Sequence, residues 1–239
     1  MKKVVHRAGG RGVGEYGWLH TKYSFSFADW HNEKRMGFGV LRVLNDDVIE
    51  PGSGFGTHSH SNMEIITIVS AGTLTHTDSL GNTGEVKAGE IQVMSAGAGV
   101  THSEYNNSKT EPLRLFQIWL FPKKLDIAPS YRQVSIAIKE QNQIIPLVIP
   151  SESKNTLSIN QDAFISEALI DTTIPLFYSI QGSNNGVYFF VIEGEVYIAG
   201  EVLTERDAIG LTELSEISIM AKRPSKILLF DVPMNVTYL

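Results

Sequence analysis

Two short segments of the sequence each place a pair of metal-binding side chains two residues apart. The first pair is His58 and His60, the second is His102 and Glu104, and one serine separates the members of each pair. Residues two apart in an extended strand lie on the same face of a sheet, so each segment presents two ligands side by side. Three imidazoles and one carboxylate suit a divalent transition metal, and Fe(II), Mn, Ni, Co, Cu and Zn all accept such a set.

The ligand set also indicates what kind of metal site to expect. Four protein ligands in octahedral geometry leave two positions open, where a substrate and O₂ can meet. A structural zinc site is more often closed, tetrahedral and rich in thiolates, and this chain has no cysteine. We therefore expect a catalytic, redox-capable metal. Glu64 has the same even numbering as His60, so an unbroken strand would turn this second carboxylate toward the site as well.

The elements that position these ligands are predicted to be strands. Short runs rich in Val, Ile, Leu, Phe and Thr alternate with turn signals at intervals of about ten residues, which is typical of a β-sandwich or barrel. In the first half these runs are Phe38–Leu44, Met63–Val69, Gly72–Asp78, Ile91–Met94 and Leu113–Phe121. Turns are predicted at Asn45-Asp46-Asp47 and at 51–54, 71–72, 81–82 and 88–90. Residues 29–36 are the one place where a short helical turn is expected.

The second half repeats the strand pattern without the chemistry. Residues 122–133 carry two prolines and two lysines and are predicted to form a linker. Strands are expected at Leu157–Asn160, Ile174–Ile180, Val187–Ile192, Glu195–Ala199 and Ile227–Asp231. The order strand, glycine turn, strand occurs in both 68–75 and 190–197, which suggests a duplicated barrel.

These observations predict the domain organisation. All seven histidines lie at or before His102, so a second barrel cannot build the same metal site. We expect an all-β protein of two tandem barrels with few short helices. The metal-binding domain is predicted to cover 1–125, and 126–239 are expected to hold the linker and a metal-free domain.

Composition excludes several classes of function. The formal net charge of −6 argues against direct binding to nucleic acid, which needs a basic face. The absence of cysteine rules out disulfides and thiolate ligands. No apolar segment follows Lys2 and Lys3 as in a signal peptide, and no apolar run approaches the roughly 18 residues that span a bilayer. We therefore expect a cytoplasmic protein that is not bound to a membrane.

The two ligand segments resemble the two motifs of the cupin superfamily. His58, His60 and Glu64 follow a glycine-led first motif, and His102 and Asn106 complete a second one. A serine at the usual proline position, and a longer glycine turn before the second motif, are similar to bacterial pirin-like proteins. That similarity extends over 17–19, 25–28, 37–47, 76–82 and 95–104 and covers nearly all of the first half.

The resemblance implies a bicupin, that is two double-stranded β-helices, with a metal only in the N-terminal barrel. The implied ligands are His58, His60, His102 and Glu104, and the implied metal is Fe(II). Glu64 occupies the place of the carboxylate ligand in ordinary cupins and is expected to be a nearby inward carboxylate.

The implied activity is that of a quercetin 2,3-dioxygenase, which opens a flavonol with O₂ and releases CO. Glu104 or Glu64 would take the proton of the substrate's 3-hydroxyl group. The apolar side chains of Phe38, Phe55 and Met94 are expected to wall the pocket of such a flat aromatic substrate. An alternative is an iron-dependent redox sensor that binds a transcription factor without turnover. The acidity of the chain would then favour a basic protein partner. A third is an unrelated cupin activity such as isomerisation.

Overall fold

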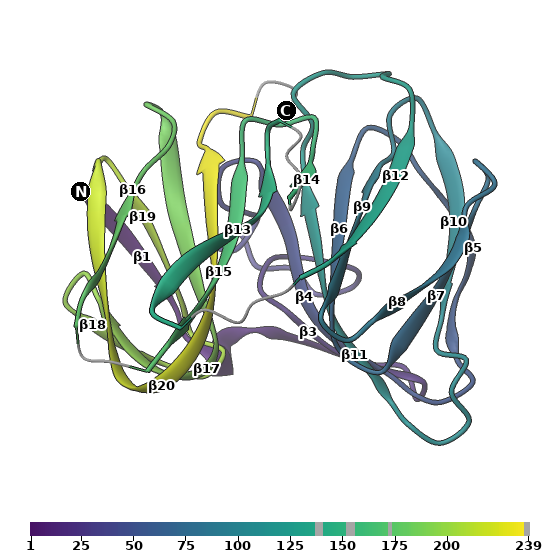
Figure 1. Cartoon of the computed structure of the whole chain (residues 1–239), viewed down its shortest axis with the longest axis horizontal. Helices are drawn as coiled ribbons and strands as arrows, with labels where there is room; N and C mark the ends of the chain where they lie inside the picture. The colour runs from purple at the N-terminus through teal and green to yellow at the C-terminus, as the bar shows by residue number, and fades with distance from the viewer. Residues whose placement is uncertain (137–140, 152–155, 172–173, 237–239) are drawn as a thin grey trace.

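The computed structural model describes residues 1–136, 141–151, 156–171 and 174–236, and in these ranges the chain is almost entirely β. Two barrels lie side by side (Figure 1). The one helical element in the described ranges is the 3₁₀ turn Ala8–Gly10, and residues 29–36 contain turns but no helix. None of the described helical structure is long and apolar enough to cross a membrane. The prediction of an all-β bicupin is confirmed.

The N-terminal barrel is built from two sheets that face each other. Within the described residues, the larger sheet has the strand order β12 (Ser130–Ser135), β9 (Glu90–Ser95), β6 (Glu64–Ala71), β11 (Leu113–Leu120), β4 (Leu41–Ile49), β3 (Leu19–Tyr23) and β2 (Gly12–Glu15). The smaller sheet has the order β5 (Gly54–His60), β10 (Val100–Tyr105), β7 (Thr73–Asp78) and β8 (Thr83–Lys87). The predicted strands of this half all appear, displaced by a few residues at their ends.

The C-terminal barrel is formed by a single curved sheet. Its described strands follow the order β1 (Lys2–His6), β19 (Ala208–Thr212), β17 (Asn185–Ile198), β20 (Glu216–Pro233), β15 (Phe164–Ile170), β13 (Gln143–Ile149) and β14 (Leu157–Ser158). Beside this path, β16 (Leu176–Ser179) pairs with β20 and β18 (Glu201–Thr204) pairs with β17.

Alternation along β6 shows how the larger sheet serves two cores. Ile66 and Ile68 face the C-terminal barrel and join a buried cluster that includes Tyr188 and Phe190. Ile65, on the opposite face, lies inside the N-terminal barrel. Period-two alternation in a strand that is covered on both faces gives a continuous apolar run, which is why this run was recognisable in the sequence.

Strand pairing crosses the predicted boundary at residue 125 in two places. β1 pairs with β19 in the C-terminal sheet, and Figure 1 shows it within that barrel. β12 pairs with β9 in the N-terminal sheet. The predicted linker 122–133 is therefore wrong from Ser130 onward, because the polar residues of β12 form an edge strand of a barrel.

Two predicted turns are in fact strand. Asn45-Asp46-Asp47 lie in the middle of β4, although three polar residues in succession are typical of a turn. The glycine turn predicted within 190–197 is a bulge in the continuous strand β17, where the pairing with β20 shifts register around Glu193. Gly194 has φ 96° there, a conformation that glycine adopts without steric cost. The supposed repeat of a turn between the two halves is not present.

Candidate metal centre

The two predicted ligand strands lie next to each other in the smaller sheet. β5 and β10 are antiparallel, and His102 pairs directly with His58. The ring centroids of His58 and His102 are 4.4 Å apart, those of His58 and His60 are 4.8 Å apart, and those of His60 and His102 are 5.0 Å apart. One potential ligand nitrogen from each of the three rings lies within 4.8 Å of the others. The sequence spacing therefore brings three imidazoles together.

The protonation of these rings suits a metal. The carbonyl oxygen of Gly56 accepts a hydrogen bond of 2.8 Å from His58 Nδ1, so the Nε2 lone pair of His58 remains free. Burial lowers the pKa of His60 to about 4 and that of His102 to about 3, so both rings are neutral at pH 7. Neither ring nitrogen of buried His102 has a hydrogen-bond partner in the described structure. Neutral, unpartnered imidazoles are what a divalent transition metal requires.

Glu104 lies on the same strand but is held on the far side of His102. Its partner on the neighbouring strand β7 is His76. A carboxylate oxygen of Glu104, a ring nitrogen of His76 and a ring nitrogen of His102 all lie within 4.8 Å of one another. Glu104 Oε1 accepts a hydrogen bond of 2.8 Å from Gln92 Nε2, and Oε2 accepts one of 2.9 Å from Gln117 Nε2. Burial raises the pKa of Glu104 to about 7. Its role as a fourth ligand stays a prediction.

Two hydroxyl groups, those of Tyr131 and Thr67, orient the side-chain amides of Gln92 and Gln117 toward Glu104. Tyr131 Oη donates to Gln92 Oε1 over 3.1 Å, and Thr67 Oγ1 donates to Gln117 Oε1 over 3.4 Å. Because each amide oxygen accepts from a hydroxyl, each NH₂ group is directed at the carboxylate. This network holds Glu104 in one rotamer and stabilises its ionised form.

His76 belongs to this centre more closely than its sequence setting indicated. Its Nε2 donates a hydrogen bond to Asp78 Oδ2 over 3.1 Å. The ring is fully buried and stacks on Tyr131 at a centroid distance of 4.5 Å. Its Nδ1 is buried without a partner. A histidine oriented by a carboxylate, with the other nitrogen free, is an arrangement common among metal ligands, and the His-x-Asp spacing was its only signal in the sequence.

Glu64 faces away from the centre, so its predicted inward orientation is wrong. β5 ends at His60 and β6 begins at Glu64, and Asn62 between them has φ 50°. In an unbroken strand, His60 and Glu64 would face the same side of the sheet. The break at Asn62 removes this relation. Glu64 Oε2 accepts hydrogen bonds from Ser95 Oγ (2.6 Å) and from the backbone N–H of Asn160 (3.1 Å) in the second half of the chain.

A cavity of about 190 Å³ extends from the histidines between the two sheets of the N-terminal barrel. Its lining consists of aromatic and aliphatic walls, the three histidines and several polar groups: Phe27, Asn45, Asp47, Phe55, His58, His60, Ile65, His102, Glu104, Gln117 and Trp119. Of the predicted pocket residues, Phe55 lines this cavity. Phe38 instead packs on Tyr188 in the core shared by the barrels, with ring centroids 5.4 Å apart. Met94 packs behind the cavity with Ile65 and Val100.

Sequence reasoning missed most of the cavity wall. Phe27 and Trp119 are in edge-on contact, at 5.4 Å between ring centroids, but they are 92 positions apart in the sequence. Asn45 and Asp47 were assigned to a turn. The one available signal was the length of the run 41–49, which is polar at its centre yet flanked on both sides by strand-forming residues.

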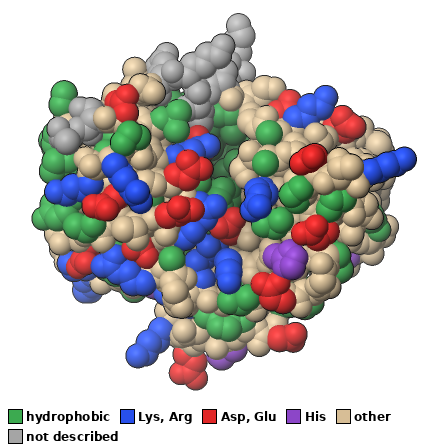
Figure 2. All heavy atoms as spheres, turned by 90° about the horizontal axis from the view of Figure 1, so that it is seen from below, with side chains coloured by type: hydrophobic (Ala, Val, Ile, Leu, Met, Phe, Trp, Pro, Cys, Tyr) green, Lys and Arg blue, Asp and Glu red, His purple; other side chains and the backbone are tan. Residues whose placement is uncertain are grey.

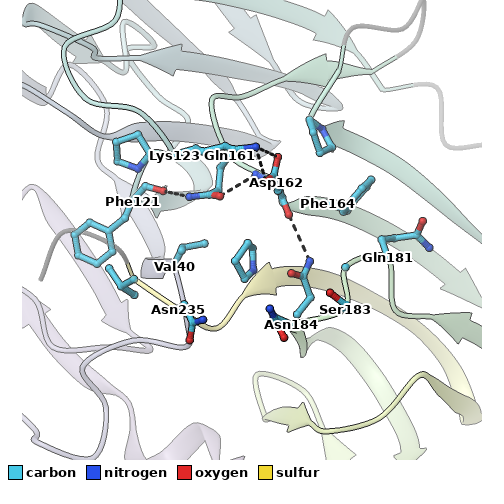
Figure 3. A pocket seen from close by; sticks show the side chains of 16 residues that line it. Val40, Phe121, Lys123, Gln161, Asp162, Phe164, Gln181, Ser183, Asn184 and Asn235 are labelled. Carbon is cyan, nitrogen blue, oxygen red and sulfur yellow. Dashed lines mark hydrogen bonds and ion pairs between the residues drawn. The ribbon is translucent and has the colours of Figure 1, made fainter.

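A second cavity, of about 570 Å³, lies where the two barrels meet (Figure 3). Several of its polar groups are partners of one another. Gln161 Nε2 donates to the carbonyl oxygen of Phe121 over 2.8 Å, and Lys123 Nζ lies 2.6 Å from Asp162 Oδ2. Asp162 is the one carboxylate among the residues that line it, and no histidine is among them. This larger cavity therefore has fewer side chains that could bind a metal or transfer a proton than the smaller one.

The charge pattern of the surface agrees with the acidic composition. On the face drawn in Figure 2, Lys and Arg side chains are interspersed with Asp and Glu across the described part of the molecule. On this face, Lys and Arg therefore do not form a continuous basic surface of the kind that nucleic-acid binding requires (Figure 2).

The fold and the centre define a class: a bicupin whose first barrel carries a histidine cluster that can hold a metal. A family model described as Pirin matches residues 5–120, and a model described as Quercetinase C-terminal cupin domain matches residues 147–232. The chain belongs to the pirin family.

Full-length relatives agree with this assignment. A protein of Escherichia coli named quercetin 2,3-dioxygenase is 40% identical over 229 residues, which cover 96% of this chain and 98% of that protein. A pirin-like protein of Caulobacter vibrioides is 38% identical over 222 residues, covering 92% and 95%. The crystal structure of the bacterial pirin YhhW from Escherichia coli in complex with nickel(II) superposes with a TM-score of 0.92 at 40% identity. The superposition covers 97% of this chain and 99% of the YhhW chain.

Proposed function

We propose that this protein is a metal-dependent dioxygenase that opens flavonols such as quercetin with O₂ and releases CO. The observation that carries the proposal is the cluster of three imidazoles, His58, His60 and His102, at an aromatic-walled cavity. The relatives named quercetin 2,3-dioxygenase support it, because their similarity extends over the whole chain. The predicted cytoplasmic location belongs to the same proposal.

The residues fit a divalent transition metal, because His102 is buried with two unpartnered nitrogens beside two further imidazoles. His58, His60 and His102 would hold the ion, with Glu104 as the fourth ligand, and Fe(II) is the ion we propose. Ni, Mn, Co, Cu and Zn suit the same donors, and nickel(II) is present in the complex of the YhhW relative. When bound, the ion supplies Lewis acidity, which lowers the pKa of a coordinated hydroxyl group.

The protein's own groups have separate tasks. Phe27, Phe55 and Ile65 form apolar walls against which a flat ring can pack and from which water is excluded. Glu104 accepts the proton of the substrate's hydroxyl group. Gln92 and Gln117 keep its oxygens in place while the proton is transferred.

The test is aerobic incubation of the Fe(II)-loaded protein with quercetin. We expect loss of the flavonol absorbance, uptake of O₂ and release of CO. His102→Ala should abolish metal binding and all three signals. His20→Ala should change none of them, because the half-buried His20 lies beside Glu15 and Glu50 and does not line the cavity. Absence of turnover in the Fe, Mn, Co, Ni and Cu forms would overturn the proposal. Binding of a protein partner by only one oxidation state of the iron would then favour the redox-sensing alternative.

A further inference from the structure

The wall of the cavity opposite β5 and β10 carries polar atoms that have no partner. Asn45 and Asp47 on β4 are only 4% and 3% exposed, and both line the cavity together with Trp119 on β11. In the described structure, Asn45 Oδ1, Asp47 Oδ1 and Trp119 Nε1 are buried without a hydrogen bond. Buried polar atoms in folded proteins are normally paired, so three unpaired ones at one cavity indicate a missing ligand.

The residue between the two acceptors, Asp46, is paired on the other face of the same strand. Asp46 points to the other side of β4, where its Oδ2 lies 2.6 Å from Arg206 Nε and 3.3 Å from Arg11 Nη1. Structural pairing therefore explains Asp46. It leaves Asn45 unexplained, and it offers Asp47 only the hydroxyl group of Thr21, the residue opposite it on β3. Polar residues at inward strand positions weaken a barrel core, so a role for them must come from the ligand.

The chemistry of the three atoms defines what they can bind. The unpaired Oδ1 of Asp47 is a hydrogen-bond acceptor, and the Trp119 indole only donates one hydrogen bond. Asn45 adds a second acceptor oxygen. A ligand that satisfies all three must carry hydroxyl groups that both donate and accept. Phe27, Phe55 and Ile65 lie around the same cavity, so the body of that ligand is flat and apolar.

The unpaired atoms and the imidazoles lie within reach of one ligand. The imidazoles come from the smaller sheet and the polar atoms from the larger one, and both line the same cavity. Trp119 contacts His60 edge-on, with ring centroids 5.0 Å apart. A molecule bound next to the histidines therefore touches the opposite wall.

We propose that Asp47, Asn45 and Trp119 recognise hydroxyl groups of the flavonol that are remote from the metal, and that these three residues select among flavonols by the hydroxyl groups they carry. This inference rests on the proposed function, since it takes the histidine cluster as the anchor of the reacting end. Asp47 is the main selectivity residue, because its buried carboxyl oxygen is left without a hydrogen bond when the ligand lacks the hydroxyl group.

The test compares two flavonols in anaerobic calorimetric titrations of the nickel(II)-loaded protein. Quercetin carries several hydroxyl groups, and 3-hydroxyflavone keeps the metal-binding 3-hydroxy-4-keto unit without them. We expect the wild-type protein to bind quercetin at least about tenfold more tightly. Asp47→Leu should remove this preference and leave the affinity for 3-hydroxyflavone and the metal content unchanged. Trp119→Phe should weaken quercetin binding by about fivefold.

A matched control and a conservative variant complete the experiment. Ser24 Oγ is also buried and unpartnered but does not line the cavity, so Ser24→Ala should keep the full preference. If Asp47→Leu does not fold, Asp47→Asn, which keeps one acceptor oxygen, should reduce the preference by about threefold. An undiminished preference in every folded Asp47 variant, or no flavonol binding at all, would overturn the inference. Selective binding without O₂ uptake in air would overturn only the proposed turnover.

Discussion

His102 is the residue on which the whole centre depends. It shares one group of potential ligands with His58 and His60 and another with His76 and Glu104. Glu104, two residues further along β10, is buried and accepts hydrogen bonds from two side-chain amides. Glu64, in contrast, faces the second barrel. The face of the strand on which a carboxylate lies therefore decides whether it can reach the histidines.

The two carboxylates give a direct test of the fourth ligand. Glu104→Gln should lower metal affinity by more than about tenfold, because the amide cannot supply a charged donor atom. Glu64→Gln should leave the metal content unchanged, because Glu64 contacts Ser95 and Asn160 instead. Elemental analysis of protein purified without chelator measures both. Loss of metal from the Glu64 variant alone would contradict our placement of the ligand.

Asp47 should make stability depend on pH. Burial raises its pKa from 3.8 to about 7, so its contribution to stability is fully present below pH 4 and is lost as the pH rises through 7. Asp47→Asn has no such loss. Relative to the wild type, this variant should gain about 2 to 3 kcal/mol between pH 5 and pH 8. Urea unfolding of the metal-free proteins at the two pH values measures the gain. If the variant and the wild type differ in stability by the same amount at pH 5 and pH 8, the raised pKa does not belong to Asp47.

At the scale of elements, the turns around the ligand strands set the geometry. The loop between β9 and β10 is joined to the break between β5 and β6, because the backbone N–H of Asn62 donates to the carbonyl oxygen of Gly97 over 2.8 Å. The backbone N–H of Ala98 donates to Ile127 in the segment that leads into β12. The two ligand strands are thus tied to each other at one end of the barrel.

Gly97 is the position in this loop that we expect to tolerate substitution least. It has φ 49°, and an added Cβ would collide with the carbonyl oxygen of Ile127. Gly97→Ala should cost about 2 to 4 kcal/mol and weaken metal binding, since it displaces the start of β10. Gly81 also has a positive φ, of 89°, but open space around it, so Gly81→Ala should cost only about 1 kcal/mol. Denaturant unfolding of both variants compares them, and equal losses would contradict the collision.

At the scale of the whole molecule, the two barrels depend on one core. Ile66 and Ile68 on β6 and Phe116 on β11 pack in the same buried cluster as Tyr188 and Phe190 from the second half. The C-terminal barrel therefore stabilises the N-terminal one by covering an apolar face of its larger sheet.

Separating the barrels tests this dependence. A fragment of residues 1–125 lacks β12 and exposes the apolar face of β6 and β11, so it should aggregate or bind a hydrophobic dye and lose the cooperative transition. Extension to residue 136 restores the pairing of β12 with β9 but leaves that face exposed. The full chain is expected to unfold in a single transition. A cooperatively folded fragment 1–125 with native metal affinity would show that the domains are independent.

Sequence alone determined the features that depend on neighbours in the chain. Alternation within a single strand places His58 beside His60 and His102 beside Glu104, and this parity holds wherever the strand is unbroken. The succession of short apolar runs predicted the all-β barrels for the same reason. The absence of histidine after His102 limited the histidine cluster to the first barrel.

Only the tertiary structure decided the features that depend on which strands meet. The break at Asn62 turned Glu64 outward, and the pairing of β10 with β7 brought His76 to Glu104. Burial on an inward strand face, which no local pattern reveals, placed Asn45 and Asp47 in a cavity wall. Side chains far apart in sequence become neighbours through strand order and register, and these are fixed by packing of the whole barrel.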